Sequence, residues 1–278
     1  SGHLYSDEDI EITELVIPSG VTSIGSKCFW GCEHLTSVTI PNTVTSIGND
    51  AFRRCDSLSA ITIPNSVTCI GERAFYDCEN LISIQFGNGI TQIGKDAFAF
   101  CWDLKKVIVP VTTIGDSAFY QCQNLAYVTM GDGVTSIGKI AFVRCNKLTT
   151  VTFSNKLTFI DDEAFKGCGN LTSLSFPRSL NNIGDEAFRD CGKLDSLSIY
   201  SDSLHVGSNV FMNCGGIKKV YCHTDPQKMF WDGRYFPSSY VDFYVYDKET
   251  YEENFPDAGV SFSDELAFFS YEGLRYKV

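Results

Sequence analysis

A repeat of 23 residues is the feature of this sequence that most limits how the chain can fold. The dipeptide Ile-Gly, or a close variant of it, occurs nine times. The spacing is 23 residues except for one unit of 21 residues, and the first residue of the dipeptide stands at positions 24, 47, 70, 93, 114, 137, 160, 183 and 206. Self-similarity at this period is typical of solenoids, in which each unit packs only against its neighbours.

The first half of each unit carries a phenylalanine that is followed three residues later by a cysteine, as in Phe52 and Cys55. Together with Ile47 and Ala51, these residues stand at offsets 0, 4, 5 and 8. Such offsets place the four side chains on one side of one or two turns of helix or 3₁₀ coil. The spacing therefore predicts a short helical return in every unit.

The second half of each unit has apolar residues at alternate positions in a stretch rich in Thr, Val and Ile. Leu58, Ile61 and Ile63 are an example, and Pro64 follows them directly. A period of two predicts a strand with one buried face, and proline ends it because proline has no backbone N–H to donate. Each unit is thus predicted to contain one short strand and one short helical return.

A single unit of 23 residues cannot bury its own apolar side, so the units are expected to stack with their strands in a parallel sheet. The predicted fold class is an α/β solenoid. We divide the chain into an N-terminal cap with a partial repeat (residues 1–23), nine repeats (24–222) and an aromatic-rich C-terminal cap (223–278).

The repeat pattern Ile-Gly-x-x-Ala-Phe-x-x-Cys-x-x-Leu-x-x-Val-x-Ile-Pro, over about residues 15–222, resembles the leucine-rich repeats of the BspA-like proteins. This resemblance implies a leucine-rich repeat horseshoe that is secreted or lies on the surface of a bacterial cell. It also implies a role in binding proteins or host matrix, without catalytic activity. A signal peptide is not recognisable in this chain, because residues 1–3 and those that follow lack a basic and an apolar region.

Charge and hydropathy argue against a nucleic-acid partner and against a membrane-spanning segment. The formal charge of the 278 residues is −12, and this sign of charge repels phosphate backbones, so we expect no nucleic-acid partner. No apolar run is long enough to cross a bilayer, so no membrane-spanning segment is expected.

The cysteines repeat at one position of the unit, which predicts a column of free, buried thiols and not a disulfide framework. Cys28 and Cys222 replace apolar core residues of the unit and are also expected in the core. A line of thiols does not converge on one point, so no metal site is predicted. Cys69 differs, because its equivalents in other units are mostly polar, and it is the one candidate for a reactive thiol.

No motif for catalysis or for a cofactor is present. The four histidines do not stand beside a nucleophile, and no glycine-rich phosphate-binding loop follows a strand. We expect the carboxylates Asp50, Asp96, Asp116 and Glu163 to interact with the helix dipole at the start of each return, and not to act as acids or bases. The chain is therefore predicted not to be an enzyme.

The exposed side of the strands is the first candidate for recognition. Most of its residues are Ser or Thr, which strand propensity and solubility explain. Three adjacent strands interrupt this field with apolar, cationic and aromatic side chains, as interface hot spots do. The candidate ligand-binding residues are Ile82, Lys105, Lys106, Ile108 and Tyr127.

A second candidate is a group of aromatic residues near the repeat Phe and Cys positions: Trp30, Tyr76, Phe100, Trp102 and Tyr120. These side chains could form a patch that binds a glycan or a partner. They could equally shield the outer edge of the core.

Three functions are consistent with these features. The first is a monomeric, non-enzymatic binding or adhesion module that recognises a protein or a glycan through the strand face. The second is a passive spacer for another domain. The third is a solenoid-type polysaccharide-cleaving enzyme, which would require clustered Asp, Lys or Arg on adjacent turns, whereas Lys105 and Lys106 have no facing carboxylates.

Overall fold

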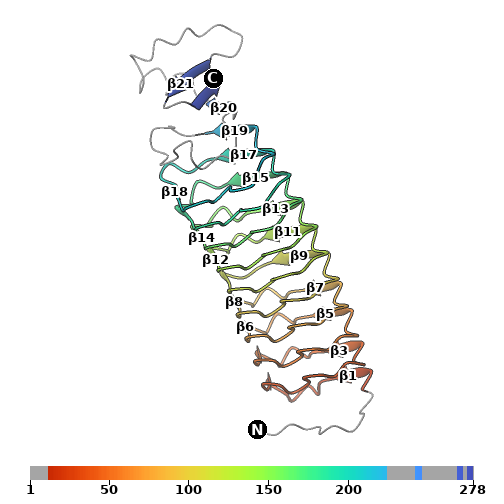
Figure 1. Ribbon diagram of the computed structural model, residues 1–278. Helices are drawn as coiled ribbons and strands as arrows, with labels where there is room; N and C mark the ends of the chain where they lie inside the picture. The colour runs from red at the N-terminus through yellow and green to blue at the C-terminus, as the bar shows by residue number, and fades with distance from the viewer. Residues whose placement is uncertain (1–11, 224–241, 246–267, 272–273, 278) are drawn as a thin grey trace.

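The computed structural model describes residues 12–223, 242–245, 268–271 and 274–277. Residues 12–223 form a stack of similar turns that follow one another along a single axis (Figure 1). The predicted N-terminal cap before residue 12 and most of the predicted C-terminal cap lie outside the described residues.

The strand predicted in the second half of each unit is confirmed. These strands are β1 (Glu14–Val16), β3 (Ser37–Thr39), β5 (Ala60–Thr62), β7 (Ser83–Gln85), β9 (Lys106–Val109), β11 (Tyr127–Met130), β13 (Thr150–Thr152), β15 (Ser173–Phe176), β17 (Ser196–Ile199) and β19 (Lys219–Cys222). They form three sheets, which contain β1 and β3, β5 to β13, and β15 to β19. Within each sheet neighbouring strands pair in parallel with equivalent residues opposite each other, as Val128 with Val151. This register places like side chains in rows along the stack.

The C-terminal strands continue this row. Strand β20 (Asp242–Val245) pairs in parallel with β19, and β21 (Phe268–Tyr271) pairs antiparallel with β22 (Leu274–Lys277). Strand β22 in turn pairs with β20. The aromatic Phe243 and Tyr244 of the predicted cap thus lie on a strand that extends the sheet of the repeats.

A second strand in each turn was missed by the sequence analysis. These strands have two residues each: β2 (Ser23–Ile24), β4 (Ser46–Ile47), β6 (Cys69–Ile70), β8 (Gln92–Ile93), β10 (Thr113–Ile114), β12 (Ser136–Ile137), β14 (Phe159–Ile160), β16 (Asn182–Ile183) and β18 (His205–Val206). They form a nine-stranded parallel sheet within the described residues. The repeat isoleucine therefore belongs to a strand and does not begin a helix.

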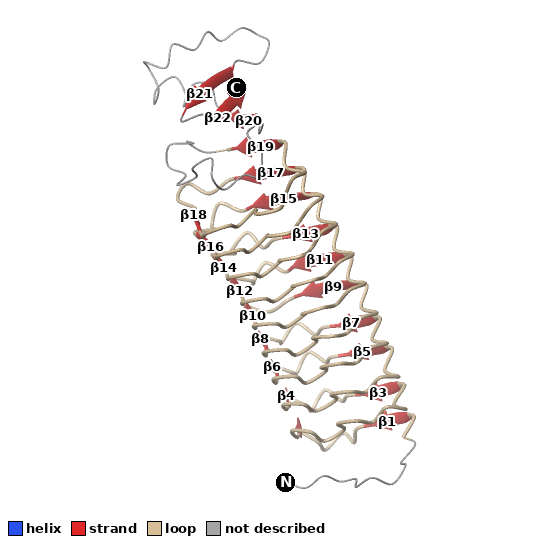
Figure 2. Cartoon of the chain, in the orientation of Figure 1, coloured by secondary structure: helices blue, strands red, loops and turns tan. Residues whose placement is uncertain are grey.

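The predicted helical or 3₁₀ return is wrong. Within the described residues the return consists of turns, and no helix is drawn in Figure 2. Its backbone N–H groups alternate in direction: Arg53 donates within its own turn to Asp50 (3.2 Å), whereas Phe52 donates to Ala74 of the next turn (2.7 Å). A helix satisfies its N–H groups locally, so a segment that shares half of them with its neighbour is not helical.

Two residues in each return have a positive φ, which breaks the helical path. In the turn that begins at Ile47 they are Asp50 (54°) and Arg54 (58°), and the equivalent residues of the other turns behave in the same way. Residues with side chains adopt this left-handed region at a cost of about 1–2 kcal/mol each. The hydrogen bonds between turns must offset that cost.

This construction also removes the curvature of the expected horseshoe. Packed helices are about 8–10 Å apart, whereas hydrogen-bonded strands are about 4.8 Å apart, so a helical return would spread one side of the stack. In this structure the return segments, like the strands, are connected to the next turn by backbone hydrogen bonds, so the spacing is similar on all sides of the stack. Figure 1 accordingly shows a nearly straight ladder.

The core consists of columns of like residues, as predicted. The repeat phenylalanines stack from Phe29 to Phe211, with ring centroids 5.0 to 5.8 Å apart. From Phe52 to Phe211 these rings are fully buried. Such offset stacks contribute about 0.5–1.5 kcal/mol per pair beyond their burial.

The column of free thiols is confirmed for most of the repeats. Eight of the eleven described cysteines, from Cys55 to Cys214, are buried, and all eleven are free. Cys28 and Cys32 are only half-buried, because they lie in the first complete turn, so their predicted place in the core is only partly correct. Cys69 is exposed, as predicted; the burial of Cys222 is outside the described features.

Candidate binding site

The five candidate residues of the strand face lie together on β7, β9 and β11 or directly before them. Lys106 is opposite Ser83 on one side and Tyr127 on the other, and Ile108 is opposite Thr129. We call Ile82, Lys105, Lys106, Ile108 and Tyr127 the strand-face patch.

Ile82 and Lys105 directly precede β7 and β9 and are neighbours. The Lys105 N–H donates to the Ile82 carbonyl at 3.2 Å. Ile82, Ile108 and Tyr127 expose 41%, 54% and 53% of their surface, and both lysines are exposed. No ion pair joins either lysine to a residue in the described part of the chain.

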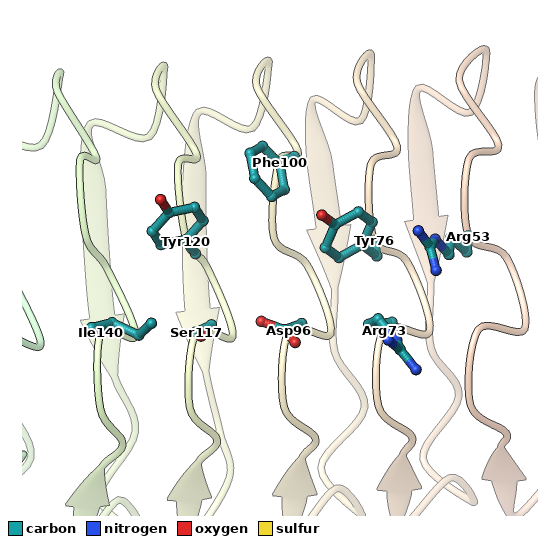
Figure 3. A pocket seen from close by; sticks show the side chains of 8 residues that line it. All are labelled: Arg53, Arg73, Tyr76, Asp96, Phe100, Ser117, Tyr120 and Ile140. Carbon is teal, nitrogen blue, oxygen red and sulfur yellow. The ribbon is translucent and has the colours of Figure 1, made fainter.

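A groove of about 280 Å³ lies on the return segments and not on the long strands. Its residues come from five successive turns: Arg53, Arg73, Tyr76, Asp96, Phe100, Ser117, Tyr120 and Ile140. Figure 3 shows them in two rows along the stack, with the aromatic rings and Arg53 in one row and Arg73, Asp96, Ser117 and Ile140 in the other. We call this feature the return groove.

Aromatic contacts connect the first row. The ring of Phe100 lies 5.2 Å from that of Tyr76 and 5.3 Å from that of Tyr120, in tilted and edge-on arrangements. The guanidinium group of Arg53 lies 4.7 Å from the centre of the Tyr76 ring. Gln121 donates a hydrogen bond to the Tyr120 hydroxyl at 3.0 Å.

The second row contains charged groups of both signs, Arg73 and Asp96, and further carboxylates lie beside it. The buried Asp50 carboxylate contacts Arg53 at 3.3 Å and Arg73 at 3.2 Å, and Arg73 also contacts Glu72 at 3.3 Å. Burial raises the pKa of the Asp96 carboxyl, which the hydrogen bond from Ser117 partly counteracts. The arginines are therefore neutralised and fixed in place by the chain itself.

Three of the five aromatic candidates meet in the return groove, and two do not. Tyr76, Phe100 and Tyr120 line it, whereas Trp30 lies beside Lys27 and Arg53 at its N-terminal side. Trp102 is exposed on the same turn as Phe100, but it does not line the groove. The sequence analysis grouped these residues only because each stands near a repeat Phe or Cys.

The second row of the groove was not recognised from the sequence: of its four residues only Asp96 was considered, and it was expected to interact with a helix dipole. Arg73, Asp96, Ser117 and Ile140 each stand three residues after a repeat isoleucine, and all have a positive φ. Aligning the units at this offset would have shown that they form one column. What the alignment could not show is that this column lies beside the aromatic one, since that depends on the form of the return.

The expected helix-dipole role of the carboxylates is wrong, because no helix is present in the described turns. Asp50 pairs with arginines, and Asp116 Oδ1 accepts a hydrogen bond from the Lys139 N–H of the next turn at 3.0 Å. Asp162 and Asp185 accept equivalent bonds from Asp185 and Ser208. These side chains connect turns.

Among the described residues, no group of three or more His, Cys, Asp and Glu side chains is arranged to hold a metal ion. The same part of the chain contains no helix that is long and apolar enough to span a membrane.

Comparison with known proteins identifies the repeat. The sequence model of a family described as BspA type leucine rich repeat region, with six copies, matches residues 4–126 and 112–229. No curated protein matches the chain.

Several solved structures are similar. The pneumococcal vaccine antigen PcpA is 20% identical, over 86% of this chain and 75% of its own, with a TM-score of 0.41. A leucine-rich repeat protein from Bacteroides ovatus is 25% identical, over 85% and 84%, with a TM-score of 0.41. The T. pallidum leucine-rich repeat protein is 23% identical, over 74% and 78%, with a TM-score of 0.47.

Proposed function

The chain belongs to the BspA-type leucine-rich repeat family, and from this premise we propose that it is a non-enzymatic binding module that recognises a protein through the strand-face patch. Repeat arrays of this kind typically serve as interaction modules on surfaces, and stacked repeats present extended surfaces for binding. We further propose that it acts in secreted form or on the cell surface.

The observation that supports the proposal is the local composition of the strand face. An exposed tyrosine and two exposed isoleucines surround two lysines in a face that otherwise consists mainly of Ser and Thr. Tyrosine is enriched at interface hot spots because its ring buries a large area at small entropic cost. The patch thus combines apolar anchors with cations at its centre.

The charge of the patch indicates the chemistry of the partner. The chain as a whole carries −12, yet Lys105 and Lys106 have no acidic neighbour on their own strands. A partner surface with carboxylates around an apolar centre would complement the patch, and the opposite charges would also raise the association rate. We therefore propose an acidic protein surface as the ligand.

The test is to measure binding to a panel of purified extracellular-matrix and mucosal proteins by biolayer interferometry at two salt concentrations. For a protein that binds, Tyr127→Ala is expected to weaken binding at least tenfold, because it removes the central anchor. The double variant K105E/K106E is expected to lower the association rate and to reverse its salt dependence, because salt would then screen a repulsion.

The chain offers a matched control for the charge reversal. Lys218 and Lys219 occupy the equivalent positions before and on β19, and both are exposed. The variant K218E/K219E changes the net charge by the same amount and is expected to bind like the unmodified chain. If both double variants weaken binding equally, or if no protein in the panel binds, the patch is not the binding site and the passive spacer is the better description.

A further inference from the structure

The return groove has no part in the proposed protein interface, and its chemistry points to a different kind of ligand. It lies on the return segments, and its residues are separate from the five residues of the strand-face patch. Three aromatic rings from successive turns line one side of it, while Arg73, Asp96 and Ser117 line the other. We infer that the return groove is a second binding site, for a neutral oligosaccharide.

The balance of charge argues against an ionic ligand. The two arginines of the groove are opposed by three carboxylates, those of Asp50, Glu72 and Asp96. Asp50 is bound to both arginines, so the guanidinium groups are already paired. A phosphate or sulfate would find no surplus of positive charge here, and burying an unmatched ion is costly.

The functional groups match a molecule with both an apolar face and hydroxyl groups. A pyranose ring presents C–H groups on one face, which pack against aromatic rings, and hydroxyl groups at its edge. Guanidinium groups donate hydrogen bonds, carboxylates accept them, and serine does both. An oligosaccharide could therefore lie on the row of rings while its hydroxyl groups contact Arg73, Asp96 and Ser117.

The dimensions also fit a short chain of sugars. The volume of about 280 Å³ is just below the range of about 300–1,000 Å³ that is usual for drug-sized ligands. The residues come from five turns, which at a spacing of about 4.8 Å gives a length of roughly 20 Å. The site is thus long and shallow, as suits an extended ligand that remains partly exposed to solvent.

Backbone strain supports a role beyond packing. Among the described residues with a positive φ, one is aromatic, Phe100 (φ 62°), and one is β-branched, Ile140 (φ 52°). Both line the groove. Bulky side chains in this conformation are unusual, and such outliers cluster at functional sites. Tyr76 and Tyr120 directly follow the repeat phenylalanine of their turns, whereas in the turn between them the buried Ala99 takes that position and Phe100 comes next. The Phe100 ring nevertheless lies in the row between Tyr76 and Tyr120.

The test uses the full chain on an array of immobilised neutral, sulfated and sialylated oligosaccharides, followed by titration of the best ligand in solution. We expect binding of neutral glycans that 0.5 M NaCl does not weaken, and at least a tenfold loss of affinity in Y76S/Y120S. Asp96→Asn, which keeps the size of the side chain, is expected to weaken binding severalfold without changing the thermal midpoint. This second variant keeps the test valid if the double variant does not fold.

Two controls make the result specific. Trp102→Ser removes an exposed aromatic residue outside the groove, and K105E/K106E alters only the strand-face patch; both are expected to bind glycan normally. Loss of glycan binding in K105E/K106E would assign the ligand to the strand face and overturn the inference. It would also fail if only charged glycans bind, or if no neutral glycan binds better to the unmodified chain than to Y76S/Y120S.

Discussion

The cysteine of each turn acts as a small apolar residue that also donates a hydrogen bond. The Cys78 thiol is fully buried and donates to the Phe52 carbonyl at 3.1 Å, and the other seven buried thiols of the column make the equivalent bond. The same carbonyl also accepts a hydrogen bond from the Cys55 N–H at 3.3 Å, so alanine at position 78 would remove one of its two donors and leave a small cavity in the column. The residue type is therefore explained by packing, without disulfide or metal chemistry.

Burial of the thiols predicts a loss of stability at alkaline pH. Burial raises the pKa of Cys78 from its usual 9.0 to about 12. Below pH 9 both states hold the proton and the contribution is complete, whereas between about pH 9 and 12 the unfolded chain ionises while the folded chain does not. Each such thiol should lower the free energy of unfolding by about 1.4 kcal/mol per pH unit in this range.

Urea unfolding under reducing conditions at pH 7 to 10.5 checks this expectation. The curve of stability against pH for Cys78→Ala should fall less steeply above pH 9 than that of the unmodified chain. Cys69→Ala serves as the control, because Cys69 is exposed, and its curve should run parallel to that of the unmodified chain. Parallel curves for both variants would contradict the role of burial.

At the scale of the element, the return segment is a series of tight turns and not a helix. Its left-handed residues are unfavourable one by one, but they direct alternate N–H groups to the next turn, as in the 2.7 Å bond from Phe142 to Ala164. Asn and Asp adopt this conformation more readily than other residues with side chains. Ile140 is therefore the least suitable residue type in its column.

Replacing Ile140 by asparagine should stabilise the fold. We expect Ile140→Asn to raise the free energy of unfolding by about 1 kcal/mol, since it relieves the strain of a β-branched residue at φ 52°. Arg144→Asn is the control, because Arg144 has a similar φ of 58° but an unbranched, exposed side chain, and its gain should be smaller. If denaturant unfolding shows that Ile140→Asn is destabilising, the packing of the isoleucine side chain outweighs the strain.

For the whole molecule, the important property is that neighbouring turns provide nearly all of one another's packing. The glycine after the repeat isoleucine shows how closely they approach: a Cβ on Gly94 would lie 2.7 Å from the carbonyl carbon of Gly71. Asp161 occupies the equivalent position of one turn, so that turn must accommodate a side chain by a local shift. Stability should then be close to a sum over turns and their interfaces.

Removal of one complete turn should leave a folded protein. Deleting residues 160–182 connects Phe159 to Ile183, which keeps the register of both sheets. The shortened chain is expected to unfold cooperatively at a lower urea concentration, with an m-value smaller by about a tenth. Deleting only residues 160–170 moves every later side chain out of register and should abolish the cooperative transition in circular dichroism. Equal behaviour of the two deletions would argue against a stack in register.

The sequence by itself determined the period, the long strands, the core columns and the burial of the thiols, because each unit repeats the same apolar residues and stacking is the only way to bury them. Only the tertiary structure decided the form of the return, the second sheet and the nearly straight axis. Apolar offsets of 0, 4, 5 and 8 fit a helix as well as a series of left-handed turns, and hydrogen bonds between neighbouring turns select the latter. The strand-face patch followed from alternation along three strands, whereas the return groove required two columns of side chains to lie beside each other, which no spacing along the chain reveals.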